Sequence, residues 1–355
     1  MSGRSLVDLH CMPAATPARR RRALRAVAFA GALCALAAPR TLTAQGAGPI
    51  DPQCRAGTTN ERITQDACQK AIDLLQFMAP QLGMALTGGN AVSGEHSALR
   101  GLGHLSIGLK VNALEAGLPR VDQRTPSTTG ASSSDYGVRS QWVPVPVVDA
   151  AIGLFRGIPF AGTYALGVDM LVNLAVLPSV DETDLSVELP DGSAKVGFGA
   201  RLGLLAETFV TPGISMTWLQ RELPTVNVKG RVSGDELDVR NVRVSTSAWR
   251  LVAGKNFSVF GVALGGGQDT YETRADAQVT INRVGPGVTS NVVTGQQDLT
   301  RNNLFGNVAL NLPALRVVAE VGRVTGGSVA TYNTFDGHKA DDARTYASIA
   351  LRVNW

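Results

Sequence analysis

The chain has 355 residues, of which 44% are hydrophobic and only 5% aromatic, a length that allows one large domain or two ordinary ones. Its net charge of +4 comes from residues 1–44, which hold seven of the 33 basic residues and one of the 29 acidic ones; the other 26 basic and 28 acidic residues leave −2. This remainder has no basic excess for binding nucleic acid. The sequence also lacks a run of about 18 apolar residues, so it predicts no transmembrane helix.

Residues 1–44 have the pattern of a secretory signal peptide. An arginine-rich stretch, 19–25, precedes 13 apolar residues, 26–38, a segment too short to span a bilayer. We expect cleavage after Ala44 and export of the rest. The alternative, a membrane anchor, is disfavoured by the same length.

Two cysteines, Cys54 and Cys68, lie downstream of the predicted cleavage site. In an oxidising compartment, two thiols separated by a short loop are expected to form a disulfide. A metal site or a redox site would need a C-x-x-C spacing or nearby histidines, and neither is present. We therefore expect no metal and no cofactor.

The segment that follows has apolar residues at spacings of three and four. They predict a helix over 63–78 that ends before Pro80, since proline lacks the N–H that a helix interior needs. The apolar residues are Ile63, Ala67, Ala71, Leu74, Leu75 and Met78. Such a helix could plug a barrel or cover one of its mouths.

After Gly89 the pattern changes to alternation with a period of two, which is typical of strands with one apolar face. In the first strand Ile107, Leu109 and Val111 alternate with polar or small residues. We predict about ten strands, within a range of ten to fourteen. They are 105–112, 142–154, 166–176, 195–204, 214–228, 235–253, 257–281, 299–312, 315–329 and 344–355.

Short and long links alternate between these strands. The short links are 155–162, 209–213, 255–256 and 313–314, and the long ones are 117–140, 178–192, 229–234, 285–297 and 331–343. Transmembrane barrels have short periplasmic turns and longer extracellular loops, whereas the crossings of a β-sandwich would mix the lengths. The chain therefore predicts an all-β fold, an antiparallel transmembrane β-barrel with a short N-terminal helical segment.

The last ten residues, 346–355, alternate in the same way and end in an aromatic residue. This pattern resembles the closing strand of bacterial outer-membrane β-barrels. The resemblance implies that the barrel-assembly machinery reads the terminal aromatic residue and that outer-membrane lipid surrounds the barrel. We expect the assembly signal to consist of Ile349, Leu351, Val353 and Trp355, on the apolar face that also holds Ala347.

The order of the segments also resembles the long-chain fatty-acid transporter family. A signal peptide (1–44), an N-terminal segment (45–99) and a barrel (100–355) follow one another, with a glycine-rich entry near 82–90. The resemblance implies an N-terminal plug and diffusion of hydrophobic compounds. The family has fourteen strands, and its Asn-Pro-Ala-Gly stretch is absent here.

Charged residues on the polar faces are expected to line the lumen. They are Lys110, Asp169, Arg201, Arg250, Arg316 and Glu320. We therefore predict a passive outer-membrane channel or transporter for small or hydrophobic solutes. The alternative is a structural or surface-interaction barrel with a closed lumen and functional extracellular loops.

Catalysis is not expected. The histidines after residue 44 are His96, His104 and His338, and the sequence pairs none of them with a serine and an acid as a hydrolase would require. His96 is expected to be a solvated loop residue. We also expect the helix to cover the periplasmic mouth, because a helix about 10–12 Å across should not fit a ten-stranded lumen lined by side chains.

Overall fold

The computed structural model describes residues 48–177, 180–182, 185–232 and 234–355. Residues 45–355 form one compact unit, to which the following description applies. The predicted signal peptide, 1–44, lies outside the described residues. No helix among the described residues has the length and apolar character needed to cross a membrane.

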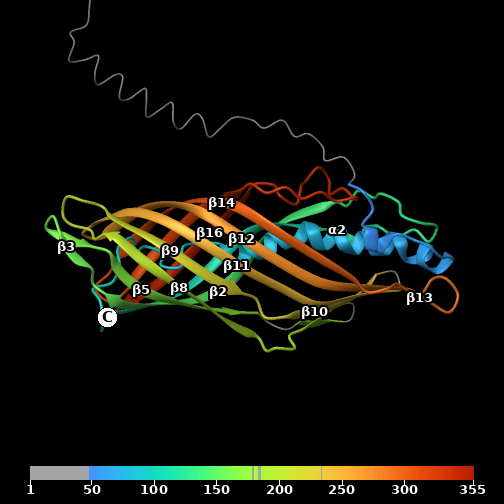
Figure 1. The fold of residues 1–355 in the computed structure, drawn as a ribbon, viewed down its shortest axis with the longest axis horizontal. Coiled ribbons are helices and arrows are strands. Elements are labelled where there is room, and N and C mark those ends of the chain that lie inside the picture. Colours follow the sequence, from blue (N-terminus) through green and yellow to red (C-terminus); the bar gives the residue numbers. More distant parts are fainter. Residues whose placement is uncertain (1–47, 178–179, 183–184, 233) are drawn as a thin grey trace, which may run out of the picture. The chain divides into compact units, whose positions relative to one another are not determined.

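The described residues contain one long helix, two short 3₁₀ turns and sixteen strands (Figure 1). The helical elements are η1 (Pro52–Cys54), α2 (Thr59–Thr87) and η2 (Val121–Gln123). The strands are β1 (Leu105–Pro119), β2 (Val138–Phe155), β3 (Ile158–Phe160), β4 (Thr163–Ala165), β5 (Gly167–Val176), β6 (Val180–Glu182), β7 (Leu185–Glu188), β8 (Ala194–Leu205), β9 (Gly213–Glu222), β10 (Val226–Val232), β11 (Asp235–Phe257), β12 (Phe260–Ile281), β13 (Val288–Thr289), β14 (Val293–Asn311), β15 (Arg316–Thr325) and β16 (Arg344–Asn354).

Ten of these strands close into a ring, which confirms the predicted barrel and its strand number. The order is β1, β2, β5, β8, β9, β11, β12, β14, β15 and β16, with every pair antiparallel. Pairing of β16 with β1, from Ser106 opposite Asn354 to Leu114 opposite Tyr346, closes the ring. The strands β10, β7 and β6 extend the wall beside β11, and β13 extends it beside β12.

The barrel is apolar outside and polar inside. Along β1, Ile107, Leu109 and Val111 are exposed whereas Ser106 and Lys110 are buried. Each of the ten strands exposes a large apolar side chain in this way, and one from each is Ile107, Val148, Met170, Phe198, Met216, Leu251, Leu264, Leu304, Val321 and Ile349. The alternation that predicted the strands therefore places the apolar face outward, the reverse of a water-soluble barrel.

The two ends of the barrel differ. Links 206–212, 258–259 and 312–315 lie at the same end as Leu105 and Trp355, and we call it the short-turn end. The links 120–137 and 326–343 lie at the other end, which we call the loop end. The link predicted over 155–162 carries a small hairpin of its own, formed by β3 and β4.

The helix α2 lies inside the ring, so the expectation of a cover over the periplasmic mouth is wrong. It contacts β1, β9, β11, β12 and β14, which lie on different sides of the lumen. A capping box between Thr58 and Glu61 begins it at the loop end, and Figure 1 shows it running along the strands from there. Most residues of its second half are buried, and all of the residues that follow, 88–96, are buried as well. We call residues 59–99 the plug.

A helix fits this narrow lumen because small residues face large ones across the contact. A Cβ added at Gly83 of α2 would lie 2.5 Å from the ring of Tyr271 on β12, and one added at Gly295 of β14 would lie 2.4 Å from Leu75. Glycine at these positions lets the helix and the wall approach more closely than other side chains allow. The estimate from helix and barrel diameters alone missed this, because it assumed average side chains on both surfaces.

The sequence predicted that the helix ends before Pro80. In the structure the helix continues past Pro80 to Thr87. Proline at position 80 cannot donate to the carbonyl of Gln76, four residues earlier. In the barrel Gln297 Nε2 of β14 donates to that oxygen at 3.1 Å. The wall therefore supplies the hydrogen bond that the proline removes, which local sequence could not reveal.

Candidate functional site

The charged residues predicted to line the lumen lie on its inner face. Five of them, Lys110, Asp169, Arg201, Arg250 and Glu320, are buried, and Arg316 is half-buried near the short-turn end. Three of the cations pair with carboxylates of neighbouring strands. Lys110 Nζ lies 3.0 Å from Asp149 Oδ2, Arg201 Nε lies 2.7 Å from Asp169 Oδ2, and Arg250 pairs with Asp269.

Five cationic side chains of the wall also bind main-chain carbonyl oxygens of the plug, and we call them the basic collar. The pairs are Arg221 with Leu86 (2.9 Å), Arg250 with Thr87 (3.3 Å), Lys110 with Asn90 (3.2 Å), Arg352 with Ala91 (3.0 Å) and Arg316 with Gly94 (2.7 Å). The last carbonyls of a helix have no partner within it and carry its negative dipole end. The last turn of α2 has no basic residue, so the wall supplies the positive charge.

An acidic group of the wall also holds the plug, from β15, the strand that carries Arg316. Glu320 Oε1 of β15 accepts from the backbone N–H of Asn90 at 2.7 Å, and its Oε2 accepts from Asn307 Nδ2 at 3.2 Å. The middle of the lumen is therefore filled by charged groups of the wall and main-chain groups of the plug.

Nearer the short-turn end, the plug places a carboxylate among arginines. Glu95 is 6% exposed, and its Oε2 lies 3.1 Å from Arg201 Nη1. Its Oε1 accepts from Ser106 Oγ at 3.1 Å, and that hydroxyl in turn accepts from Arg352 Nη1 at 2.8 Å. The charge of Arg316 also acts on this carboxylate.

His96 is buried, so the expectation of a solvated loop residue is wrong. Its Nε2 lies 2.7 Å from Glu207 Oε2, in the link between β8 and β9. The backbone N–H of Asn256 donates to Glu207 Oε1 at 2.6 Å, and its side-chain Nδ2 donates to Oε2 at 2.7 Å. We call these three residues, His96, Glu207 and Asn256, the latch; it connects the plug to the link between β8 and β9 and to the end of β11.

The two titratable groups of the latch have shifted pKa values. Burial is the largest influence on His96 and lowers its pKa, although the hydrogen bond and charge of Glu207 act in the opposite direction. Burial raises the pKa of Glu207, but the hydrogen bonds from Asn256 and His96 outweigh this and leave its pKa below the usual range. The fold therefore favours neutral histidine beside an ionised carboxylate.

At the loop end the plug is tied to the long loops by two aspartates. Asp66 accepts from the backbone N–H groups of Ser127 (2.6 Å) and Ser132 (2.8 Å). Asp73 accepts from the N–H groups of Tyr332 (3.2 Å) and Asn333 (2.8 Å). These bonds hold two long loops, 120–137 and 326–343, against the helix.

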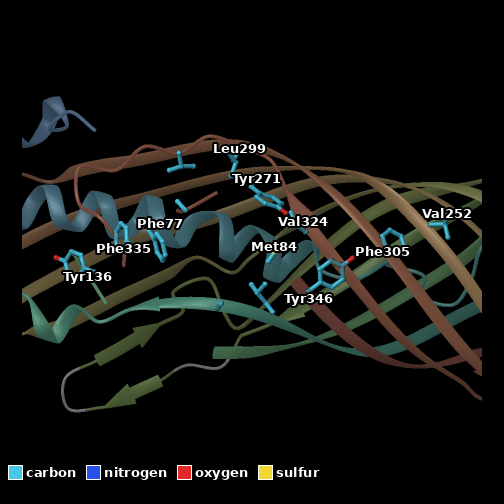
Figure 2. Packing of buried hydrophobic residues seen from close by; sticks show 14 of the residues in the cluster. Phe77, Met84, Tyr136, Val252, Tyr271, Leu299, Phe305, Val324, Phe335 and Tyr346 are labelled. Carbon is cyan, nitrogen blue, oxygen red and sulfur yellow. The ribbon is translucent and has the colours of Figure 1, made fainter. Parts of the chain in front are cut away.

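An aromatic cluster packs beneath these loops (Figure 2). Phe77 of the plug stacks on Phe335 with ring centroids 4.1 Å apart, and Phe335 stacks on Tyr136 at 5.7 Å. Met84 and Tyr271 belong to the same cluster. Burying each large apolar side chain is worth about 1.5–3 kcal/mol, so apolar packing stabilises this half of the plug.

The predicted disulfide is present and lies at the loop end of the plug. Cys54 and Cys68 are bonded, and both are buried in a cluster with Ala71 and Ile72. The bond joins η1 to the first half of α2 and restricts the chain before the helix.

The predicted assembly residues lie on β16 or just after it. Ile349, Leu351 and Trp355 are exposed, and Val353 is half-buried. The backbone N–H of Trp355 donates to Leu105 O at 2.8 Å, so the last residue is paired with the first strand.

The lumen residues predicted from the sequence did not include Arg221, Arg352, Glu95 and Glu207, although alternation places Arg352 on the polar face of the closing strand. Arg221 and Arg352 lie in register with other inward residues, so alternation within β9 and β16 could have found them. Glu95 and Glu207 lie outside the strands, where no periodicity indicates which way a side chain points. Among the described residues no group of three or more metal-ligating side chains is placed to hold a metal ion.

No family model matches the chain, and no curated protein matches it. Several solved structures of outer-membrane proteins are similar to it in fold. The translocator domain of the autotransporter NalP from Neisseria meningitidis is 8% identical, with 81% of this chain and 98% of that chain covered and a TM-score of 0.41. The toluene transporter TbuX of Ralstonia pickettii is 10% identical (74% and 74% covered, TM-score 0.29), and the CymD monoaromatic hydrocarbon channel is 11% identical (87% and 97% covered, TM-score 0.23). At these identities and TM-scores the likenesses say nothing of this chain's solute.

Proposed function

We propose that this protein is an outer-membrane channel whose lumen is closed at rest by its own N-terminal plug, and that small solutes pass when the plug moves. The membrane part of the proposal is supported by the apolar exterior of all ten strands. Soluble monomers rarely expose apolar patches above a few hundred Å². The likeness to the long-chain fatty-acid transporter family stays a prediction, and ten strands rather than fourteen depart from it.

Aromatic residues mark the two edges of this exterior. On β11, Trp249 and Phe257 are both exposed and lie eight residues apart. At about 3.3 Å per residue and a tilt of about 40°, they are separated by roughly 20 Å along the barrel axis. The apolar band of an outer-membrane barrel is about 25 Å tall and is bounded by aromatic girdles.

The channel part is carried by one observation, the basic collar. Its side chains bind plug carbonyls, and both kinds of group can be hydrated when they separate. A hydrogen bond exchanged for water costs only about 0.5–1.5 kcal/mol net, and about 1.5–3 kcal/mol where one partner is charged. Withdrawal of the plug would thus expose a polar, water-filled lumen rather than an apolar one.

The second candidate is a closed surface barrel with functional loops. It is favoured by the aromatic cluster around Phe77 and by the aspartate anchors, which hold the plug and the loops together as one body. In this case the plug never leaves, and the loop end is the functional surface.

Conductance in planar bilayers separates the two candidates. Gly83→Leu places a side chain where even a Cβ would lie 2.5 Å from Tyr271, and we expect it to displace α2 and to raise channel opening over the closed wild type. Asn60→Leu, at the exposed start of the helix, is the matched control and should stay closed. Gly83→Leu combined with Tyr271→Ala restores space and should close again. A folded, inserted Gly83→Leu that never conducts would favour the surface barrel.

A further inference from the structure

The surroundings of Glu95 contain more positive charge than the wall neutralises. Arg201 has a wall partner, Asp169, at 2.7 Å. Arg316 and Arg352 have no carboxylate within ion-pair distance among the residues that the structure describes, and the charges of both act on Glu95. Burying an unneutralised charge is costly, so this cluster depends on Glu95 and, at Arg316, also on the charge of Glu207.

Two of the arginines around Glu95 also have hydrogen-bond donors without an acceptor. Arg201 Nη2 and Arg352 Nε are buried and have no acceptor among the described residues. Guanidinium groups suit carboxylates because their N–H groups form a planar fork. The cluster can therefore accommodate more acceptor oxygens than Glu95 and the plug carbonyls provide.

The edge of the cluster, at Arg316, is reached from the short-turn end, whereas Arg201 and Arg352 are buried behind it. A cavity of about 320 Å³ is lined by Glu95 and Arg316 together with His104, Asn354 and Trp355, which lie at that end of the barrel. Plug residues 96–99 and Glu207 line the same cavity, so a small solute entering from this side meets Arg316 together with the carboxylates of Glu95 and Glu207.

We propose that Arg201, Arg316 and Arg352 form a binding site for the carboxylate group of a small solute, and that Glu95 of the plug occupies this site in the closed state. Solute carboxylates then compete with Glu95 for the same arginines and weaken the attachment of the plug near the short-turn end. The role in transport rests on the proposed function, but the site itself can be tested without any conduction.

The test uses the full-length protein in detergent with Glu95→Ala, which removes the internal carboxylate. We expect this variant to melt below the wild type and acetate to raise its melting temperature more than chloride does at equal ionic strength. The wild type, whose site is filled, should show no such preference. Adding Arg316→Gln or Arg352→Gln to Glu95→Ala should weaken acetate binding by on the order of tenfold, the loss expected for a hydrogen bond to a charged group.

Equal stabilisation by chloride and acetate would overturn the proposal, and so would an acetate effect that survives loss of both arginines. If Glu95→Ala does not fold alone, its refolding yield against acetate concentration is the readout. A yield restored by acetate supports the site, and a yield that acetate leaves unchanged contradicts it. Because none of these readouts involves current, a Gly83→Leu variant that fails to conduct would reject the channel without deciding the site.

Discussion

At the scale of single residues, one wall side chain repairs a defect in the plug. Pro80 leaves Gln76 O without its helical partner, and Gln297 Nε2 replaces it from β14. A buried carbonyl without a partner costs about 1–3 kcal/mol, so loss of this one hydrogen bond is expected to lower the free energy of unfolding by that amount.

We expect Gln297→Leu to lower the free energy of unfolding by about 1–3 kcal/mol. In the background of Pro80→Ala, which restores the helical N–H, the same substitution should cost much less. Gln296→Leu, on the outward face of the same strand, is the matched control and should be nearly neutral. Urea titration in detergent measures all four variants, and equal costs in both backgrounds would contradict the pairing.

The latch between His96 and Glu207 predicts a pH dependence. Both groups have lowered pKa values in the folded protein. As the pH falls, the unfolded chain therefore binds more protons than the folded protein does, and the free energy of unfolding decreases. The contribution of His96 is fully present above about pH 6.5, its ordinary pKa, and is lost as the pH falls below that value. The contribution of Glu207 is lost at lower pH, below the ordinary range for glutamate.

Melting temperatures measured from pH 8 to pH 4 should therefore fall towards acid, with the first loss below about pH 6.5. Glu207→Gln should flatten the lower part of this curve, and His96→Asn the upper part. A profile of His96→Asn that coincides with that of the wild type would show that another group is responsible.

At the scale of elements, the plug enters the barrel from the loop end. Thr58 and Glu61 begin α2 beside the loops, whereas Glu95 and His96 lie near the short turns. The segment before the helix is therefore expected on the outer side of the membrane, and not at the periplasmic mouth.

Cysteine labelling on whole cells checks this direction. Asn60→Cys is exposed at the start of α2 and should react with a membrane-impermeant maleimide in intact cells. Val210→Cys, 83% exposed in a short turn, should react only after the outer membrane is permeabilised. The opposite pattern would reverse the orientation.

The strands were predictable because each one needs only local alternation, as in β1 and β16. The position of the plug was not, because it depends on a fit between Gly83 and Tyr271, residues 188 positions apart in the sequence. The lumen charges could be found where they lie within strands, as Arg201 and Glu320 do. Glu95 could not, because an irregular segment has no period that assigns its side chains to a face.

The closing strand has its own prediction. Trp355 is 62% exposed and contributes little to the core, so its removal should impair assembly far more than stability. We expect a chain ending at Asn354 to reach the outer membrane at reduced levels, while the assembled fraction melts as the wild type does. Normal levels would remove the assembly role of this residue, and immunoblots of membrane fractions decide it.

At the scale of the whole molecule, the exterior is built for an apolar solvent. Leu264, on β12, is 73% exposed and lies midway between the aromatic edges. In water, exchange of an exposed leucine for lysine would change stability little. At the middle of a bilayer, the same exchange costs about 2–4 kcal/mol.

Leu264→Lys should therefore lower the unfolding free energy by about 2–4 kcal/mol in lipid vesicles. Gln296→Lys, on the polar outer part of β14, should have an effect near zero. Equal effects of the two substitutions would show that the apolar exterior does not face lipid.

Enclosure of the plug restricts the order in which the molecule can be made. The plug is continuous with β1, and the ring closes where β1 pairs with β16, the first and last strands of the barrel. A ring already closed would have to admit both α2 and the chain that precedes it, which the Cys54–Cys68 disulfide ties to the first half of α2. We therefore expect the N-terminal segment to enter the ring before β1 pairs with β16. A chain whose ring closes first is expected to leave its N-terminal segment outside an empty ring.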